Sequence, residues 1–401
     1  MKKILFSSLT QRILWTVFIL FIYLLGKYIP LSTYPENLAQ HQSALEQTLN
    51  SFAMVTGGEF SRLNLFSLGL SPWMTSMILW RFVTVLKVND GFTQVQNHVS
   101  QMFIMLLVGL IQSFGFLAAQ SEFTASPYRQ LATILILLAG SFVLMWLGNL
   151  NNQKGLGGSS AIIVTGMILS FITSITALDG SALTHPLVWA GLPILVLFLV
   201  WLTVYIYKAE YRIPIRRIMI NSDLLKSSYI PIRLTPAGGM PFMYGMTLMT
   251  LPVLLLQALT AIFPQIAFLK AYEGQLSITA LPGILLYNII LFLLSYGFAY
   301  FNMDPTDVAE NMQKNGDYIE GIRPGKSTQK FLTAKLNRMA FIGAIYTCFM
   351  GGLPLYLAWY FNADTGLGMM VNNIYIITTL MLTIVEQVDI IQSWKKYDHI
   401  I

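Results

Sequence analysis

The side chains that most often bind metals or perform catalysis are scarce in this chain and lie far apart. Histidine occurs at four scattered positions, His41, His98, His185 and His399, and none of their spacings is typical of a metal site. The single cysteine, Cys348, lies in an apolar run and excludes a disulfide framework. We therefore expect no metal, no cofactor and no catalytic residues.

Two further signatures of energy-coupled chemistry are also missing. The glycine-rich turn 155–159, with the sequence GLGGS, lacks the lysine that a phosphate-binding loop requires. The central parts of the apolar runs contain almost no Asp, Glu, Lys or His, and Glu386 and Asp389 lie only at the end of the last run. Because ion-coupled transporters need such groups near the membrane midplane, the sequence favours a passive conduit driven by a protein that docks on it.

The amino-acid composition indicates whether the chain folds in water or in a lipid bilayer. The chain has 401 residues, of which 55% are hydrophobic and 10% are charged, and its mean hydropathy is +0.62. A soluble domain carries about 25% charged residues. The chain is therefore expected to be a polytopic membrane protein, and a soluble enzyme, a secreted disulfide scaffold, a disordered chain and a fibrous repeat are excluded.

The apolar runs predict ten membrane-spanning helices, because hydrocarbon cannot satisfy an open backbone. Their approximate ranges are 13–31, 72–88, 99–119, 131–150, 160–178, 187–207, 238–260, 281–301, 339–360 and 371–391. The basic start MKKILF resembles the beginning of a signal peptide, but no small-residue cleavage site follows it. We therefore expect a retained first helix.

The distribution of basic residues predicts the orientation. If the N-terminus is cytoplasmic, 20 of the 24 Lys and Arg residues lie on the cytoplasmic side, and only Lys27, Arg62, Arg129 and Lys270 lie outside. This is the bias of the positive-inside rule. We expect a multi-pass protein of the plasma membrane with both termini in the cytoplasm, and the net charge of +6 requires no nucleic-acid partner.

Three features depart from a plain bundle of helices. The segment 57–72 is moderately apolar and broken at Gly69 and Pro72, so a helix in it is either a re-entrant half-helix or an amphipathic helix on the outer leaflet. Arg81 lies near the cytoplasmic end of span 72–88, which favours snorkelling over a place in a pathway. Gly and Pro interrupt span 238–260, which indicates an inverted-repeat channel or transporter, or simply ordinary tolerance of Gly and Pro.

Two long cytoplasmic loops, at about 208–237 and 302–338, are the fourth feature. In the second loop, Asp304 is placed to cap a short helix that Asn315-Gly316 closes. The following turn, GIRPGK, holds Arg323 away from the membrane. Such local order favours a docking site for a soluble protein, whereas the basic residues of the first loop are also compatible with contact to anionic lipid.

At these residues the chain resembles the SecY family of protein-export channels. The strongest match is the second loop, from Phe301-Asn302-Met303-Asp304-Pro305 through Ala309-Glu310-Asn311 to Gly316 and Gly321-Ile322-Arg323-Pro324-Gly325. Further matches are Arg12 to Pro30, Leu65-Phe66-Ser67-Leu68-Gly69, Gln112-Ser113, Met145-Trp146-Leu147-Gly148 and Ala237 to Pro241. The resemblance covers nearly the whole chain, from Arg12 to about Trp394.

The resemblance implies an all-α fold of two pseudosymmetric five-helix halves, residues 1–178 and 179–401, around an hourglass pore. It implies a re-entrant plug helix at about 58–70 that includes Ser61, Arg62, Leu63, Asn64, Leu65 and Phe66. The pore ring maps onto Met74, Ile78, Val164, Met243 and Met381, with Thr247 close by. Unbranched methionines suit a ring that reseals around varied chains. The lateral gate is expected between spans two and three and spans seven and eight, with Gln112 in its polar seam.

The resemblance also implies partners. The cytoplasmic loops look like the docking surface for a SecA-type motor ATPase, to which we assign Arg216, Arg217, Arg323 and Lys326. The other expected partners are small SecE- or SecG-like or accessory Sec subunits, an unfolded secretory polypeptide and membrane lipids. Three positions depart from the family pattern, Gly158, Ser160 and Glu320, and they argue against a general range of substrates.

Within the family, the chain most resembles the accessory SecY proteins of Gram-positive cocci. It is shorter than most housekeeping members and carries SPWM at 71–74 and ILW at 78–80. This resemblance implies export of large serine-rich glycosylated adhesins, driven by an accessory SecA. The alternatives are a housekeeping SecY channel for general export and insertion, a secondary transporter of small solutes, and a non-conducting membrane scaffold.

Overall fold

The chain folds into a bundle of long helices, and the predicted all-α membrane architecture is confirmed. The computed structural model describes residues 2–31, 55–58, 63–85, 91–119, 127–177, 186–217, 228–262, 275–361 and 365–397. The ten helices that coincide with the predicted spans are α1 (Lys2–Lys27), α3 (Ser71–Val85), α4 (Gln94–Ala119), α5 (Pro127–Lys154), α6 (Gly158–Ala177), α8 (Pro186–Lys208), α9 (Met240–Ile262), α11 (Leu281–Asn302), α13 (Lys326–Tyr360) and α14 (Thr365–Tyr397).

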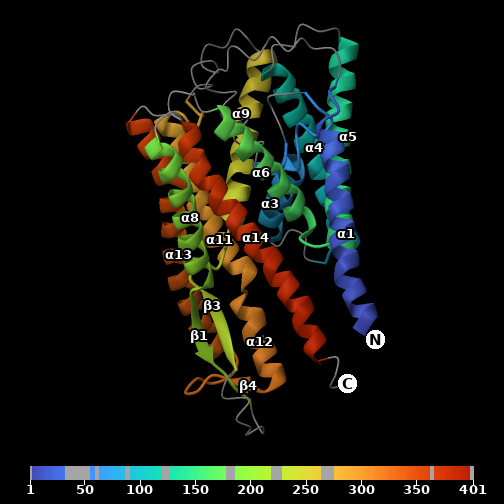
Figure 1. The fold of residues 1–401 in the computed structure, drawn as a ribbon. Helices are drawn as coiled ribbons and strands as arrows, with labels where there is room; N and C mark the ends of the chain where they lie inside the picture. The colour runs from blue at the N-terminus through green and yellow to red at the C-terminus, as the bar shows by residue number, and fades with distance from the viewer. Residues whose placement is uncertain are drawn as a thin grey trace.

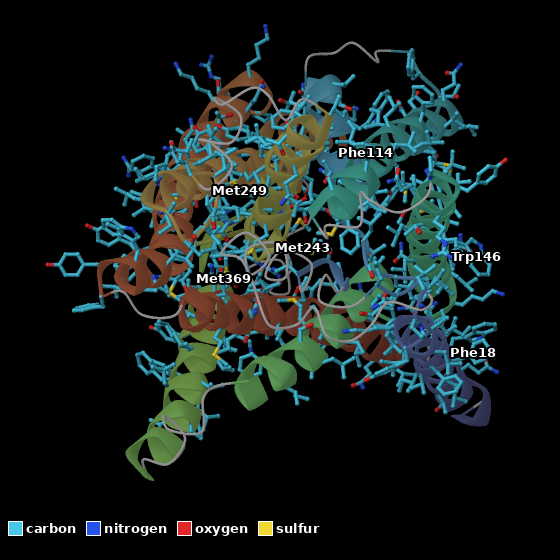
Figure 2. The ribbon with its side chains drawn as sticks, turned by 90° about the horizontal axis from the view of Figure 1, so that it is seen from above. Phe18, Phe114, Trp146, Met243, Met249 and Met369 are labelled. Carbon is cyan, nitrogen blue, oxygen red and sulfur yellow. The ribbon has the colours of Figure 1, made fainter. Side chains whose placement is uncertain are left out.

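The length and surface of these helices suit a bilayer. Seven helices in the described residues are long and apolar enough to cross a membrane, and α6 and α8 contribute shorter apolar stretches, Gly158–Ile172 and Pro193–Lys208. Seen from above, Phe18 and Trp146 lie at the rim of the bundle (Figure 2), and they are 53% and 60% exposed. Because large apolar side chains are stable at such a rim only in lipid, the protein is a multi-pass membrane protein.

One end of the bundle carries the parts that extend beyond the long helices. A further helix, α12 (Pro305–Asn315), and four strands lie there, together with the start of α1 and the end of α14 (Figure 1). We call this the loop end. The start of α1, the end of α14 and the described parts of both long predicted loops therefore share one end, as an even number of spans requires.

The two long loops are joined by short strands that the sequence did not predict. Strand β1 (Glu210–Pro214) pairs antiparallel with β3 (Tyr229–Arg233), and β2 (Arg216–Arg217) pairs antiparallel with β4 (Asp317–Tyr318). Pro214 and Pro231 lie in the β1–β3 hairpin. Proline removes a backbone donor and is confined to edge strands, so it weakened the strand signal in the sequence.

A second apolar core lies under these strands. Ile213 and Ile232 of the hairpin pack with Met312 of α12 and with Leu332 and Leu336 of α13. Because α13 buries these leucines, it begins at Lys326, well before the predicted span 339–360. Hydropathy detects only the part of α13 that is apolar enough to cross lipid. The helix itself begins earlier, in the polar loop end.

The predicted capping of α12 is confirmed. The Asp304 carboxylate accepts a hydrogen bond from the Thr306 amide at 2.8 Å, and Pro305 opens the helix. Gly316 ends it with φ of +73°, the left-handed conformation in which glycine has no steric penalty.

Candidate functional site

Five of the six predicted ring residues lie together in the centre of the bundle. Met74 and Ile78 come from α3, Val164 from α6, and Met243 and Thr247 from α9, and their exposed fractions are 2%, 2%, 3%, 8% and 0%. Thr247 Oγ1 lies 3.9 Å from Met74 Sδ and donates a hydrogen bond to the Met243 carbonyl at 2.8 Å. Met243 occupies the middle of the view from above (Figure 2). Three helices thus converge on a closed apolar centre.

The sixth ring residue differs from the others. Met381 of α14 is 42% exposed, whereas Tyr375, Ile376 and Leu380 of the same helix join the buried cluster, as does Met369. The structure therefore brings Met74, Ile78, Val164, Met243 and Thr247 together, and leaves Met381 outside that contact.

The described part of the predicted plug segment is buried in the bundle, and it is not a helix. Ser61 and Arg62 lie outside the described residues, and residues 63–70 form an isolated bridge followed by turns. Asn64 pairs with Pro30 in that bridge, and the Leu70 amide donates to the Thr56 carbonyl at 2.9 Å. Burial excludes an amphipathic surface helix for this part and agrees with a segment that re-enters the bundle.

Close packing holds this segment against α1 and α5. Phe66 is 3% exposed and stacks on Tyr23 of α1 with ring centroids 6.2 Å apart. The Asn64 side chain accepts from the Phe66 amide at 2.9 Å, which fixes the turn. A β-carbon at Gly140 of α5 would overlap the Leu65 carbonyl oxygen. The glycine therefore allows the turn to approach the helix backbone.

A polar seam joins α3 and α4 to α9 at the predicted lateral gate. The buried Gln112 donates from Nε2 to Thr250 Oγ1 at 3.3 Å, and Thr250 Oγ1 lies 3.4 Å from Ser71 Oγ. Gln112 Oε1 is buried without a hydrogen-bond partner in the described part of the chain. Gly115 of α4 packs against the Leu254 backbone of α9 so closely that a β-carbon would overlap it. The seam is therefore closed. Sequence reasoning missed Ser71 and Thr250, since single hydroxyls in apolar spans carry no signal.

The glycine-rich turn before α6 has a structural role. Asn151 Nδ2 donates to the carbonyls of Leu156 and Gly158, both at 2.8 Å, and the Gly157 amide donates to Gln387 Oε1 of α14 at 3.0 Å. Gly157 and Gly158 both have positive φ, 75° and 52°. The turn thus ties α5 and α6 to α14.

At the loop end, the predicted docking residues lie on both connected loops. Arg216 is 3.1 Å from Glu320, and both side chains are exposed. The backbone of Arg217 pairs with that of Asp317 in the β2–β4 ladder. Glu320, which departs from the family pattern, therefore forms an ion pair that joins the two loops, although an exposed pair contributes only about 0–1 kcal/mol.

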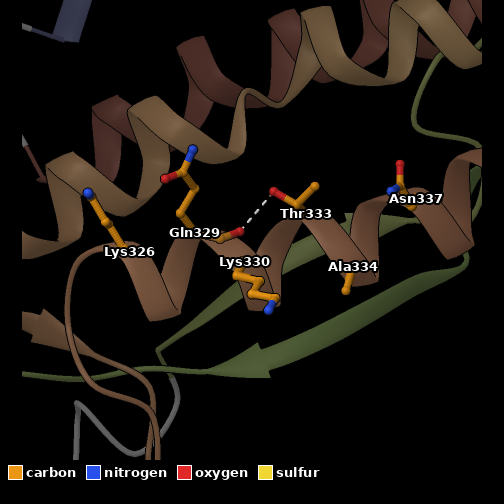
Figure 3. A pocket seen from close by; sticks show the side chains of 6 residues that line it. All are labelled: Lys326, Gln329, Lys330, Thr333, Ala334 and Asn337. Carbon is orange, nitrogen blue, oxygen red and sulfur yellow. Dashed lines mark hydrogen bonds between the residues drawn. The ribbon is translucent and has the colours of Figure 1, made fainter.

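Of the other two predicted docking residues, Lys326 lines a groove along the start of α13, and Arg323 lies in the turn before that helix. Arg323 and Lys326 are exposed, and the Arg323 carbonyl accepts from Thr328 Oγ1 at 3.0 Å. The groove is lined by Lys326, Gln329, Lys330, Thr333, Ala334 and Asn337 (Figure 3). Lysines one helical turn apart on its wall make it a basic surface that suits an acidic partner.

A charged contact fixes the hairpin to the bundle. Arg233 of β3 lies 2.9 Å from the Glu386 carboxylate of α14 and donates to the Tyr207 hydroxyl at 2.8 Å. Partial burial acts to lower the pKa of Arg233, but Tyr207 and Glu386 outweigh it and hold that pKa above its ordinary value. The hairpin is therefore anchored by a guanidinium that stays charged.

The fold and the site together define a polytopic helical membrane protein whose helices close on an apolar centre and whose loops form one ordered end. The sequence profile of the SecY family matches residues 64–385. This chain therefore belongs to the SecY family.

Named relatives cover almost the whole chain. A protein of Streptococcus parasanguinis called accessory Sec system protein translocase subunit SecY2 is 38% identical over 98% of this chain and 97% of its own length. Proteins of the same name in Leuconostoc gelidum subsp. gasicomitatum and Streptococcus gordonii are 35% and 32% identical; they match 96% and 99% of this chain and 96% and 99% of their own lengths.

Solved structures share the fold. One described as a protein-conducting channel has a TM-score of 0.71 at 16% identity, covering 95% of this chain and 92% of that chain. Sec61 in a canine ribosome–channel complex has a TM-score of 0.66 at 16% identity with the same coverage.

The packing at Gly140 gives a testable prediction. We expect Gly140→Ala to lower the melting temperature of the purified protein by several degrees, because overpacking costs about 1–3 kcal/mol. The matched control is Gly297→Ala in α11, where a β-carbon meets no atom within 4 Å, and helix propensity there favours alanine by about 1 kcal/mol. Thermal unfolding of both variants in detergent measures this, and equal melting temperatures would contradict the described packing.

Proposed function

We propose that this chain is the channel subunit of an accessory Sec translocon and conducts unfolded secretory polypeptides across the plasma membrane. The observation that carries the proposal is the closed apolar centre formed by Met74, Ile78, Val164 and Met243 in a SecY-family bundle. The name shared by relatives at 32–38% identity supports the accessory type.

The apolar centre acts as the seal of the resting channel. A ring of apolar side chains excludes water and ions by dewetting. Methionine has three rotatable bonds and a polarizable sulfur, so Met74 and Met243 adapt to the differing side chains of a moving polypeptide. Thr247 belongs to the same layer, and Met381 swings toward the ring as α14 adjusts. The buried turn 63–70, together with Ser61 and Arg62 of the same predicted segment, acts as the plug.

The polar seam acts as the lateral gate between two halves, residues 1–178 and 179–401. Opening separates α3 and α4 from α9 and α11 and breaks the contact of Gln112 with Thr250. The free Oε1 of Gln112 favours this separation, because a buried unpaired acceptor costs about 1–3 kcal/mol. In the open state, Gln112 faces water or lipid headgroups, which removes the free-energy cost of the unpaired Oε1.

The loop end acts as the docking surface for a SecA-type motor. Arg216, Arg217, Arg323 and Lys326 supply positive charge on loops that the β2–β4 pairing holds in one unit. The loop end and both termini face the cytoplasm, in agreement with the positive-inside bias of the sequence. The motor hydrolyses ATP, and this chain itself performs no catalysis. Small subunits, either SecE- or SecG-like or of the accessory Sec type, bind the helical bundle in the lipid bilayer.

The substrates are a few large serine-rich glycosylated surface adhesins. A deletion strain with a quantitative inventory of exported proteins tests this. We expect the cells to grow and to lose only one or a few large glycosylated surface proteins. Loss of viability, or a fall of export across the proteome, would contradict the accessory type and indicate a housekeeping channel.

The seal can be tested with one side chain. We expect Met243→Asn to raise the resting ion conductance of reconstituted channels by about tenfold, since burying an unpaired amide costs roughly 1–3 kcal/mol and water replaces it. Met243→Leu, which stays apolar, should leave the conductance low. Single-channel recording in planar bilayers measures both, and a tight Met243→Asn channel would reject Met243 as part of the seal.

The docking surface can be tested by charge reversal. We expect Arg323→Glu to reduce motor-driven export by about tenfold or more while the protein inserts and melts normally, because like charges at an interface cost several kcal/mol. Lys314→Glu on α12 makes the same charge change at a lysine that lies 3.5 Å from Glu310, and it should export normally. Export into membrane vesicles is the readout, and normal export by Arg323→Glu would reject the docking role.

A further inference from the structure

Arg81, at the end of α3, reaches across to α11. Its guanidinium carbon lies 4.8 Å from the centre of the Phe301 ring and 5.7 Å from that of Phe298. Phe298 is 3% exposed and stacks on Tyr244 of α9 with ring centroids 5.1 Å apart. These distances are typical of cation–π contacts, in which a cation is attracted to the negative face of a ring.

The contact differs from the snorkelling that the sequence favours. A snorkelling arginine extends along its own helix toward water, and it needs no particular partner. Here the guanidinium lies over two rings of a helix more than 200 residues away in the sequence, and one of those rings is fixed by a third helix. The side chain therefore acts between helices.

The position of Arg81 complements the polar seam. Ser71 begins α3 and contacts Thr250 of α9, whereas Arg81 lies near the other end of α3, toward the loop end. Helix α3 is thus tied to the second half of the chain at both of its ends, first by hydroxyl groups and then by a cation on aromatic rings.

We propose that Arg81, Phe298 and Phe301 form a clasp that holds the lateral gate shut at the loop end. The proposal rests on the gate described above and adds the residues that set its resting position. When α3 and α4 separate from α9 and α11, the guanidinium must leave the rings, so the clasp favours the closed state and sets how readily the gate opens.

A different contact joins the turn before α6 to α14. There the Gly157 amide donates to Gln387 of α14 at 3.0 Å, and a β-carbon at Gly157 would lie 2.9 Å from Ile384. Neither α6 nor α14 contributes a residue to the clasp or to the polar seam. In the proposed opening, the Arg81 contact breaks and the contact between Gly157 and Gln387 stays in place.

The distance between α3 and α11 tests the clasp in the resting protein. Spin labels replace the exposed Thr84 and Leu293 in a Cys348→Ser background, and double electron–electron resonance in lipid nanodiscs reports the distance distribution. We expect Arg81→Gln and Phe301→Leu each to raise the population at the longer distance about two- to fivefold, the effect of losing a cation–π contact of a partly exposed guanidinium. The double variant should not exceed Arg81→Gln, because Arg81→Gln already removes the contacts with both rings, whereas Phe301→Leu leaves the contact with Phe298.

The matched control is Arg212→Gln. Arg212 lies 4.7 Å from the Tyr229 ring, but both residues belong to the β1–β3 hairpin, so its loss should leave the labelled distance unchanged. Arg81→Lys, which keeps the charge, should restore part of the wild-type distribution, a rescue that a merely structural role of the arginine would not give.

The outcomes separate this inference from the proposed function. Unchanged distance distributions in Arg81→Gln and Phe301→Leu, with both proteins folded, would overturn the clasp even if export is normal. Longer distances in these variants would support the clasp even if no polypeptide is ever conducted, in which case the proposed function fails alone. Equal shifts in Arg81→Gln and Arg212→Gln would also overturn it, because the effect would then reflect lost charge at the loop end.

Discussion

The apolar contact of α3, α6 and α9 at the centre of the bundle is the interaction on which the rest of the structure depends. Met74, Ile78, Val164 and Met243 meet there without a single charged group among them. Dispersion and exclusion of water hold such a contact, and neither requires a fixed partner. A centre of this kind closes firmly at rest and still yields to a chain of any sequence.

The interactions around that centre differ in chemistry from one side to the other. On the gate side, α3 and α4 meet α9 and α11 through long hydrogen bonds and a cation on aromatic rings. On the far side, the turn before α6 meets α14 through a shorter hydrogen bond and close packing of Gly157. The close packing of Gly115 against the Leu254 backbone shows that the gate side is also tightly packed at rest, so the proposed opening separates close backbone contacts as well as polar ones. The loop end is braced by the two strand pairs and by the contact of Arg233 with Glu386.

Much of this arrangement can be predicted from the sequence, and there are physical reasons why the other contacts cannot. Long apolar runs predict the spans, and the cap of α12 is visible because Asp304, Pro305 and Gly316 act on adjacent backbone. The ring residues carry no signal of their own, since a methionine on a membrane helix is ordinarily packing, and they came from the family resemblance. The clasp and the polar seam join residues far apart in the chain, so no local pattern encodes them. Proline concealed the hairpin strands, and the exposure of Met381 depends on how α14 packs.

Photocrosslinking tests most directly whether the apolar centre is a path for polypeptide. A photoreactive amino acid replaces Met243 at the centre of the bundle or Trp146 at its rim (Figure 2), and an export substrate is arrested partway through the membrane. We expect the probe at position 243 to form adducts with the arrested polypeptide and the probe at position 146 to react with lipid. Adducts with lipid alone at both positions would contradict the account.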